Sequence, residues 1–246
     1  MRIIDTHCHF GVSNLSGWNV READLLAALE AHGVSMALVM PHAVTDDPIA
    51  SHDQVAELCR RHPTRFRGVV NLSPVQSESA YRDEGARCVH DLAFVAIKLN
   101  PMQHLASPVM ANADKVFATA EELAVPVIVH TGIGAPWALP SLCIPPARRH
   151  PTLPIVLAHA GYALYAEEAL VAAQECANIF LEPSWCTVTD IQKFIRAIGA
   201  DRIMFGSDHP DNIPVELAKY RSLRLKEHEL AACLGGTAAR LYRLDA

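Results

Sequence analysis

Thirteen histidines in a chain of 246 residues are the side chains of this sequence that most directly suggest chemistry. His7 and His9 form a His-x-His pair, and His130 and His159 each begin a short stretch that continues into glycine, His-Thr-Gly and His-Ala-Gly. Imidazole nitrogens combined with a carboxylate, such as that of Asp208, bind Zn²⁺ and similar first-row metals. The fold decides whether these side chains can meet.

Short apolar runs rich in β-branched residues recur along the chain, and they are continuous rather than alternating. Such runs are typical of strands buried on both faces, as in a parallel sheet. We expect strands at residues 2–6, 36–40, 67–71, 95–99, 127–129, 155–158, 179–181 and 203–205. Segments of helical length accompany them, at residues 22–32, 49–61, 77–90, 114–124, 141–149, 165–176, 190–198 and 215–223.

This alternation predicts an α/β fold, a (β/α)₈ barrel of the TIM type that takes in residues 1–246 as a single domain. A short helical extension is expected at 226–244, in two segments with the Gly235-Gly236 pair as the break between them. A doubly wound open sheet is the competing architecture. Its usual Gly-rich phosphate turn after the first strand is missing from this sequence.

In a TIM barrel the chemistry lies at the carboxyl ends of the strands. His7 and His9 end the first expected strand, and because residues i and i+2 of a strand point to the same side, both can face the barrel axis. His130, His159 and Asp208 end the fifth, sixth and eighth strands and so reach the same mouth. The sequence therefore predicts a metal centre rich in nitrogen ligands, with one carboxylate.

The sequence resembles the amidohydrolase superfamily, and more closely its amidohydrolase-related branch (amidohydrolase 2) of metal-dependent hydrolases and decarboxylases. The resemblance covers nearly the whole chain, and Thr237 departs from it where the family more often has Asn. It is specific for the fold and the metal site but unspecific for the substrate. The matching stretches are residues 5–9, 97–101, 130–132, 159–161, 205–210 and 234–241.

This resemblance implies that His7, His9, His130 and Asp208 hold a divalent metal, with Zn²⁺ expected first and Mn²⁺ second, and that His159 acts beside it as acid or base. A metal held in this way can bring the pKa of a bound water toward about 7. Asp208 would bind the metal through one oxygen and accept the proton of the water on the other.

The leading prediction is a metal-dependent hydrolase of an amide, lactone or ester bond in a small cyclic or aromatic molecule. Non-oxidative decarboxylation of an aromatic or unsaturated carboxylic acid on the same metal site is the alternative, and the residues do not choose between the two. A non-catalytic barrel that binds a metal or a ligand is an alternative of another class. The intact His-x-His pair and Asp208 count against it.

Lys98 ends the fourth expected strand and has two interpretations. In some members of the superfamily a lysine at this strand end is carboxylated and bridges two metals, and His130 and His159 would then serve the second ion. In the closer branch a lysine in a similar Lys-x-x-Pro turn stays a plain amine. We therefore expect one metal per chain, with Lys98 as a candidate partner for a substrate carboxylate or as a structural ion pair.

Aromatic side chains in the segments that open on the mouth are candidates for the substrate pocket. Trp18, Trp137 and Trp185 follow the first, fifth and seventh strands, where they can wall a planar or cyclic substrate. His42 and His209 end the second and eighth strands and are further pocket candidates. Arginine is absent from these segments, which favours a mono-anionic or neutral substrate over a phosphate or a dicarboxylate.

The other histidines receive simpler interpretations. His104, in the loop after the fourth strand, is a weaker pocket candidate. The remaining six lie on helices or at helix ends, where a solvated or capping role is expected. They are His32, His52, His62, His90, His150 and His228.

Composition excludes several classes of partner. The formal net charge of -6, without a basic stripe, argues against nucleic-acid binding. Seven scattered cysteines without a Cys-x-x-Cys pair favour reduced thiols in a cytoplasmic protein. No signal-like or membrane-length apolar run is present, so neither export nor membrane association is expected. The expected partner is a small-molecule substrate, and the resemblance adds the option of a homo-oligomer.

Overall fold

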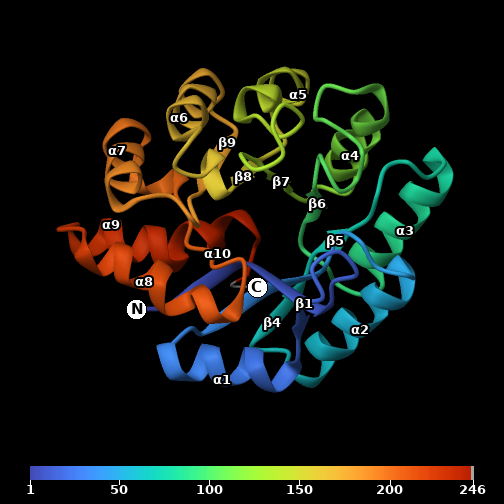
Figure 1. Cartoon of the computed structure of the whole chain (residues 1–246), viewed down its shortest axis with the longest axis horizontal. Helices are drawn as coiled ribbons and strands as arrows, with labels where there is room; N and C mark the ends of the chain where they lie inside the picture. The colour runs from blue at the N-terminus through green and yellow to red at the C-terminus, as the bar shows by residue number, and fades with distance from the viewer. Residues whose placement is uncertain (245–246) are drawn as a thin grey trace.

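The computed structural model describes residues 1–244. Its parallel strands are arranged around a common axis, inside a ring of helices (Figure 1). The TIM-barrel prediction is confirmed. Most strands are short and apolar, as expected of strands covered on both faces. In chain order they are β1 (Ile4–Val12), β3 (Met36–Pro41), β4 (Phe66–Gly68), β5 (Val70–Asn71), β6 (Ile97–Leu99), β7 (Val127–His130), β8 (Ile155–Ala158) and β9 (Ile179–Glu182). The short β2 (Asn19–Val20) pairs antiparallel with the end of β1.

Two sheets, ordered β2-β1-β3-β4 and β5-β6-β7-β8-β9, make up the barrel wall. They meet at Val69, between β4 and β5, where the Val69 N–H donates to the Val39 carbonyl and the Val70 N–H donates to the Ala96 carbonyl. β4 and β5 together therefore form the third strand of the barrel.

The segment 203–208 closes the other side of the barrel. Ile203 pairs with Leu181 of β9, and Asp208 pairs with Cys8 of β1, each as a parallel bridge. The strand expected at 203–205 thus takes the eighth position through isolated pairings rather than as a regular ladder. Its far end places Asp208 directly beside the middle of β1, next to His7 and His9.

Several helices begin or end at local signals. Asp47 and Ser77 cap α2 (Pro48–Arg61) and α3 (Glu78–His90) by accepting hydrogen bonds from backbone N–H groups of the first turn, and Gly33 ends α1 (Glu22–His32) in the left-handed conformation. A 3₁₀ turn at Pro140–Cys143 leads into the short α5. The outer helices are α1 (Glu22–His32), α2 (Pro48–Arg61), α3 (Glu78–His90), α4 (Ala111–Glu122), α5 (Ile144–Arg149), α6 (Ala166–Glu175), α7 (Val188–Ile198) and α8 (Ile213–Ser222).

Alternate residues of the strands pack into two separate apolar clusters. In β3, Ala37 and Val39 join the large cluster under the outer helices, whereas Met36, Leu38 and Met40 join a smaller one. That smaller cluster also contains Ala238, Ala239 and Tyr242 from the C-terminal segment. It therefore fills the barrel interior and forms a floor beneath the mouth.

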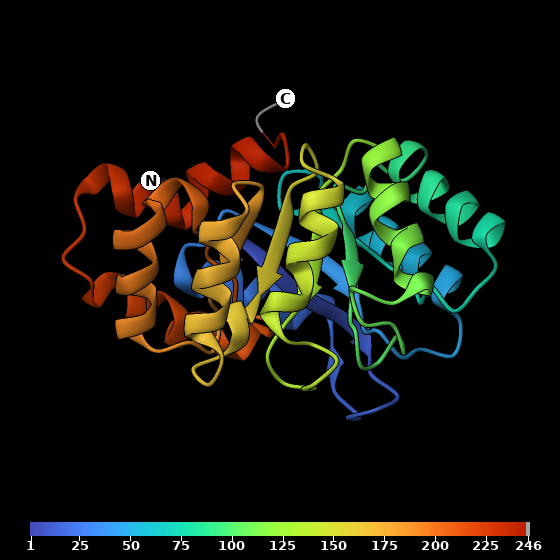
Figure 2. The same cartoon turned by 90° about the horizontal axis from the view of Figure 1, so that it is seen from above.

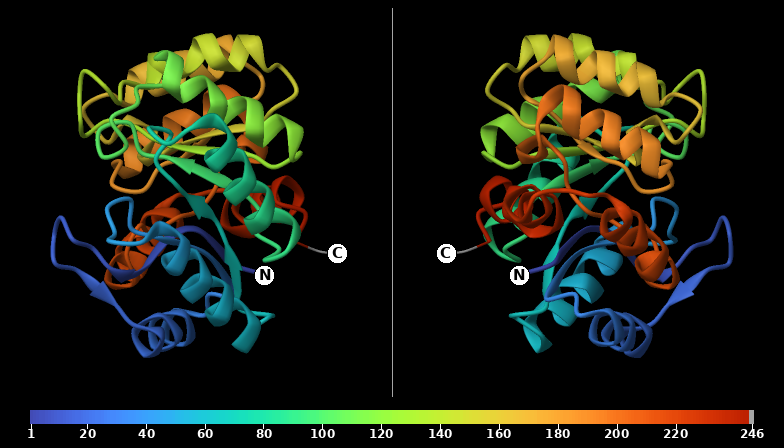
Figure 3. Two further views of the ribbon diagram at one scale, coloured as in Figure 1. Left: turned by 90° about the vertical axis from the view of Figure 1, so that its right-hand side faces the viewer. Right: turned by 90° about the vertical axis from the view of Figure 1, so that its left-hand side faces the viewer.

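The C-terminal segment lies at the end of the barrel opposite the loop after β1, as the side views show (Figures 2 and 3). It consists of α9 (Glu227–Ala231), a π-helical turn (Ala232–Gly236) and α10 (Thr237–Leu241). The expected break at Gly235-Gly236 is wrong, because the backbone stays helical through both glycines. Gly235 instead allows close packing, since a Cβ there would lie 2.4 Å from the Arg2 carbonyl oxygen.

Within residues 1–244, no helix is both long and apolar enough to span a bilayer.

The expected solvated or capping role of His52 is wrong, because its side chain is buried. Its Nδ1 donates to Glu84 Oε1 at 2.8 Å, and its Nε2 accepts the Asn71 N–H at 3.0 Å. Burial alone would raise the pKa of the Glu84 carboxyl, but hydrogen bonds from His52, Arg87 and Cys88 lower it from 4.5 to about 2. The group joins α2, α3 and β5 on the outside of the barrel.

We expect Gly235→Ala to lower the free energy of unfolding by about 1–3 kcal/mol, because the new methyl group would press on the Arg2 backbone. Gly236→Ala is the matched control, since its Cβ would have no atom closer than 3.4 Å and its backbone is already helical. Urea unfolding of both variants gives the comparison. Equal stabilities would contradict the close approach at Gly235.

Glu84→Gln is expected to cost about 1.5–3 kcal/mol of stability at pH 7, through the loss of charge-assisted hydrogen bonds. A lowered carboxyl pKa stabilises the fold above the unfolded value of 4.5, and this contribution disappears as the pH falls toward 2. The deficit of the variant should therefore shrink over that range. Glu78→Gln, at an exposed position of the same helix, should change stability by less than about 0.5 kcal/mol. A deficit independent of pH would refute the role of the Glu84 charge.

Candidate metal centre and catalytic site

A β-bulge in β1 aims the first two candidate ligands. The pairing of β1 with β3 shifts register between Asp5 and Cys8. Ile4 belongs to the interior cluster, so strict alternation would turn Cys8 inward as well, yet Cys8 packs in the outer cluster. The shift therefore turns His7 and His9 toward the barrel axis, as bulges beside active sites commonly do.

Asp5 holds the bulge against the closing segment. Its carboxylate accepts hydrogen bonds from the His7 N–H (3.1 Å), the Ser207 N–H (3.0 Å) and the Ser207 hydroxyl (2.5 Å). Burial raises the pKa of Asp5 to about 7, against the opposing effect of these hydrogen bonds. The Asp208 N–H donates to the His7 carbonyl at 2.7 Å, so His7 and Asp208 lie side by side.

His7, His9 and Asp208 form a group close enough to hold one cation. Asp208 Oδ1 lies 3.4 Å from His7 Nε2 and 3.6 Å from His9 Nε2. His159 Nε2 is 4.0 Å from the same oxygen. Two imidazole nitrogens and a carboxylate oxygen are a donor set that suits a first-row divalent metal.

Each of these histidines has its second ring nitrogen occupied. His7 Nδ1 lies 3.0 Å from Glu182 Oε2, and His9 Nδ1 lies 3.2 Å from the Pro41 carbonyl oxygen. With Nδ1 as the donor, the lone pair is on Nε2, the atom that faces Asp208. Metal-binding histidines are commonly oriented by such partners.

His130 lies farther from the donor atoms of His7, His9 and Asp208 than those atoms lie from one another. Its ring lies 4.8 Å from the ring of His159, and its Nε2 lies 2.8 Å from the Ile133 carbonyl oxygen. Among the described residues, His130 does not belong to the close donor group. Donation to Ile133 leaves Nδ1 as the nitrogen available to a metal, so its assignment as a ligand stays a prediction.

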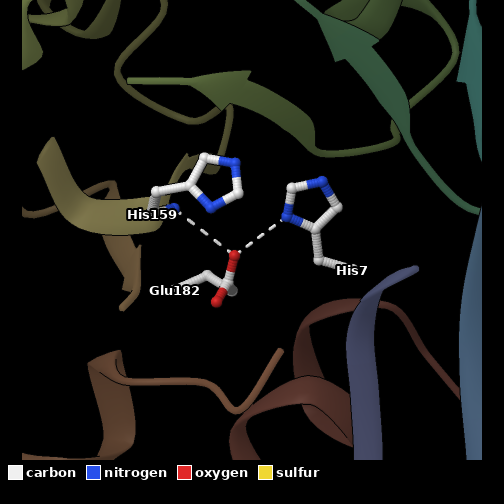
Figure 4. A group of neighbouring side chains, drawn as sticks. All are labelled: His7, His159 and Glu182. Carbon is white, nitrogen blue, oxygen red and sulfur yellow. Dashed lines mark hydrogen bonds and ion pairs between the residues drawn. The ribbon is translucent and has the colours of Figure 1, made fainter. Parts of the chain in front are cut away.

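Glu182, at the end of β9, is a buried site residue that the sequence analysis missed (Figure 4). Its Oε2 accepts from His7 Nδ1 and from the Ser184 hydroxyl (3.1 Å), and lies 3.4 Å from the His159 N–H. Gly206 packs against it, where a Cβ would be 2.6 Å from the Glu182 carboxyl carbon. The available signal was an acidic residue directly after the seventh expected strand.

His159 lies in a left-handed turn that follows β8. His159, Ala160 and Tyr162 have φ of 65°, 41° and 54°, values that residues other than glycine rarely adopt. The Thr131 hydroxyl holds the turn by accepting the Gly161 N–H at 2.9 Å. His159 Nδ1 lies 2.7 Å from the Ser184 hydroxyl, which itself donates to Glu182, so the Nε2 facing Asp208 carries the lone pair.

Burial keeps the histidines of the site neutral. It lowers the pKa of His7, His9 and His159 well below 6.5, and neighbouring positive charge, including that of Lys98, acts in the same direction. The pKa of His130 falls to about 4 for the same reasons. Neutral imidazoles are the form that binds a metal.

Lys98 brings a positive charge to the donor group. The side chain is buried, and its Nζ lies 2.9 Å from His7 Nε2. Burial lowers the pKa of Lys98 to about 8, against the opposing effect of Asp208 and Glu182. Burial also raises the pKa of the two neighbouring carboxyls, that of Glu182 to about 8 and that of Asp208 above its ordinary value. A divalent cation would favour their ionised forms.

The predicted pocket residues fall at different distances from this centre. His42 stacks on His9, with ring centroids 4.7 Å apart, and Trp18 contacts His209 edge to face at 5.0 Å. Trp185 reaches the donor group itself, because its indole N–H donates to Asp208 Oδ2 at 3.1 Å. Trp137 is partly exposed and makes no side-chain hydrogen bond or ring contact within residues 1–244.

His104 has a structural role. It is fully buried, and its Nδ1 accepts the Asn100 N–H at 3.2 Å within the loop after β6. Burial lowers its pKa to about 3. This histidine stabilises the loop that follows Lys98.

This chain is similar to several bacterial decarboxylases. A γ-resorcylate decarboxylase from Rhodococcus jostii is 25% identical over an alignment of 250 positions, gaps included, that covers 79% of this chain and 76% of the relative. The crystal structure of a Polaromonas dihydroxybenzoic acid decarboxylase, with bound manganese and 2-nitroresorcinol, has a TM-score of 0.80 at 20% identity and covers 100% of this chain and 98% of its own. The structure of 5-carboxyvanillate decarboxylase from Sphingomonas paucimobilis has a TM-score of 0.79 at 16% identity, with 98% and 99% covered.

The two structural likenesses establish the fold. The amidohydrolase family model (Amidohydro_2) matches residues 4–244, nearly the whole sequence. This chain therefore belongs to the amidohydrolase family and is an enzyme of that superfamily.

Proposed function

We propose that this protein is a metal-dependent, non-oxidative decarboxylase of a small hydroxylated aromatic carboxylic acid. The observation that carries the proposal is that the curated relatives matching 79% to 89% of the chain are γ-resorcylate decarboxylases. They support decarboxylation, the alternative of the sequence analysis, better than its leading prediction of hydrolysis. The donor group of the barrel mouth serves either reaction, so the site geometry is compatible with this choice.

His7, His9 and Asp208 would hold one divalent cation, with Nδ1 of His130 as a further ligand. The fit rests on the closeness of their donor atoms and on the Nδ1 partners of the two histidines, which leave both Nε2 atoms facing Asp208. When bound, the cation supplies Lewis-acid polarisation of the substrate oxygens. Manganese is present in the Polaromonas relative, so Mn²⁺ stands beside Zn²⁺ as the candidate for this chain.

Lys98 and His159 have separate roles in this proposal. The buried amine of Lys98 pairs with the substrate carboxylate and orients the ring. When carbon dioxide leaves, the electron pair of the broken bond stays on the ring carbon, which must take up one proton. His159 takes this proton from solvent on Nε2 and delivers it to the ring carbon, because Ser184 holds its other nitrogen. His42, Trp18 and Trp185 provide aromatic surface beside the substrate.

We expect the protein loaded with Mn²⁺ or Zn²⁺ to release carbon dioxide from a 2,6-dihydroxybenzoate probe, with about one metal ion bound per chain. Chromatography of the phenol product and metal analysis measure the two quantities. Chelation should abolish turnover, and added metal should restore it. Hydrolysis of ester, lactone or amide probes without any decarboxylation of aromatic acids would overturn the proposal in favour of a hydrolase.

Asp208→Asn should keep the fold yet lose both tight metal binding and turnover. The expected loss of kcat/KM is larger than the about 100-fold that removal of an outer hydrogen-bond partner of a metal ligand costs. Asp211→Asn, three residues away and almost fully exposed, is the matched control and should retain activity. Circular dichroism checks folding. An active Asp208→Asn enzyme would refute the role of this carboxylate.

A further inference from the structure

Trp185 has a backbone conformation that bulky side chains rarely adopt. Its φ is 66°, and it lies three residues after the end of β9. Positive φ at a large aromatic residue is strained, and such strain persists only where the surroundings hold the residue in place. The hydrogen bonds of Trp185 identify what holds it and what it does there.

A buried glutamate of α8 fixes the backbone of Trp185. The Trp185 N–H donates to Glu216 Oε1 at 2.9 Å, and Glu216 is only 1% exposed. The same oxygen accepts from Asn212 Nδ2 (3.1 Å) and Lys219 Nζ (2.7 Å). Three donors thus fix one carboxylate oxygen, which in turn fixes the strained residue.

The side chain of Trp185 acts on Asp208. Its indole N–H donates to Asp208 Oδ2 at 3.1 Å, while Oδ1 of the same carboxylate faces His7 and His9. An indole nitrogen is a donor only and cannot accept a proton in exchange. The two oxygens of Asp208 therefore have different partners, one toward the metal ligands and one toward tryptophan.

We propose that Trp185 is a positioning residue that presents one oxygen of Asp208 to the metal and withholds the other from water, so that the site favours decarboxylation over hydrolysis. This inference rests on the proposed function. Hydrolysis of an ester adds the OH of water to the acyl carbon, and the proton of that water passes to the leaving alkoxide through a carboxylate oxygen. Decarboxylation has no such step, because the ring carbon keeps the electron pair of the broken bond and takes up one proton.

Trp185→Phe tests this role, because it keeps an aromatic ring and removes the N–H. We expect about 10–100-fold weaker Mn²⁺ binding by calorimetric titration, as for the loss of other partners of metal ligands. The kcat for 2,6-dihydroxybenzoate should fall, whereas hydrolysis of 4-nitrophenyl acetate should rise relative to it. Trp185→Gln, which retains an N–H donor, should recover part of the Mn²⁺ affinity.

Trp137→Phe is the matched control for Mn²⁺ affinity, which it should leave unchanged. Should Trp185→Phe fail to fold, Glu216→Gln is the second variant, because it weakens the hydrogen bond to the Trp185 backbone and keeps the indole. It should likewise weaken Mn²⁺ binding and raise hydrolysis relative to decarboxylation. Unchanged Mn²⁺ affinity together with an unchanged ratio of the two reactions would overturn the inference. A wild-type protein without decarboxylase activity would instead refute the proposed function, and the Mn²⁺ titration would still decide whether Trp185 positions Asp208.

Discussion

A carboxylate buried within the barrel mouth, Glu182, sets the arrangement on which the site depends. Burial raises its pKa to about 8, and a buried carboxyl group without hydrogen-bond partners would cost several kcal/mol, so donors must surround it. They come from β1 through His7, from the turn after β8 through His159, and from the segment after β9 through Ser184. Satisfying one carboxylate therefore fixes the candidate metal ligand and the candidate acid or base relative to each other. Gly206 contributes by leaving room for it.

The barrel separates stability from chemistry along its axis. Below the mouth, the interior is apolar and is closed by α10, while the outer helices pack on the opposite faces of the strands. Above this floor, polar side chains gather because each strand ends there. The bulge at Asp5 marks the transition, since it is there that β1 changes which residues face the axis. Substrate preference then depends on the loops of the mouth, which the floor does not constrain.

Much of the fold and part of the site could be predicted, because their signals are local. The β-branched runs predicted the barrel. The histidines and the aspartate at the strand ends predicted that His7, His9 and Asp208 lie together. Glu182 was missed because the expected strand stopped one residue before it. His52 was misjudged because its burial depends on contacts with Asn71 and Glu84, which are distant in sequence. The choice between decarboxylation and hydrolysis could not be predicted either, since the same residues serve both.

Three residues of the site, His159, Trp185 and Asp208, share a positive φ that glycine would adopt without strain. Each such position costs about 1–3 kcal/mol, a considerable part of the stability of an average domain. Relaxing any of them would make the protein more heat-resistant while deleting a side chain that the reaction needs. Selection for thermal stability alone would therefore replace these three residues first. Catalytic activity and thermal stability place opposing demands on the same backbone positions.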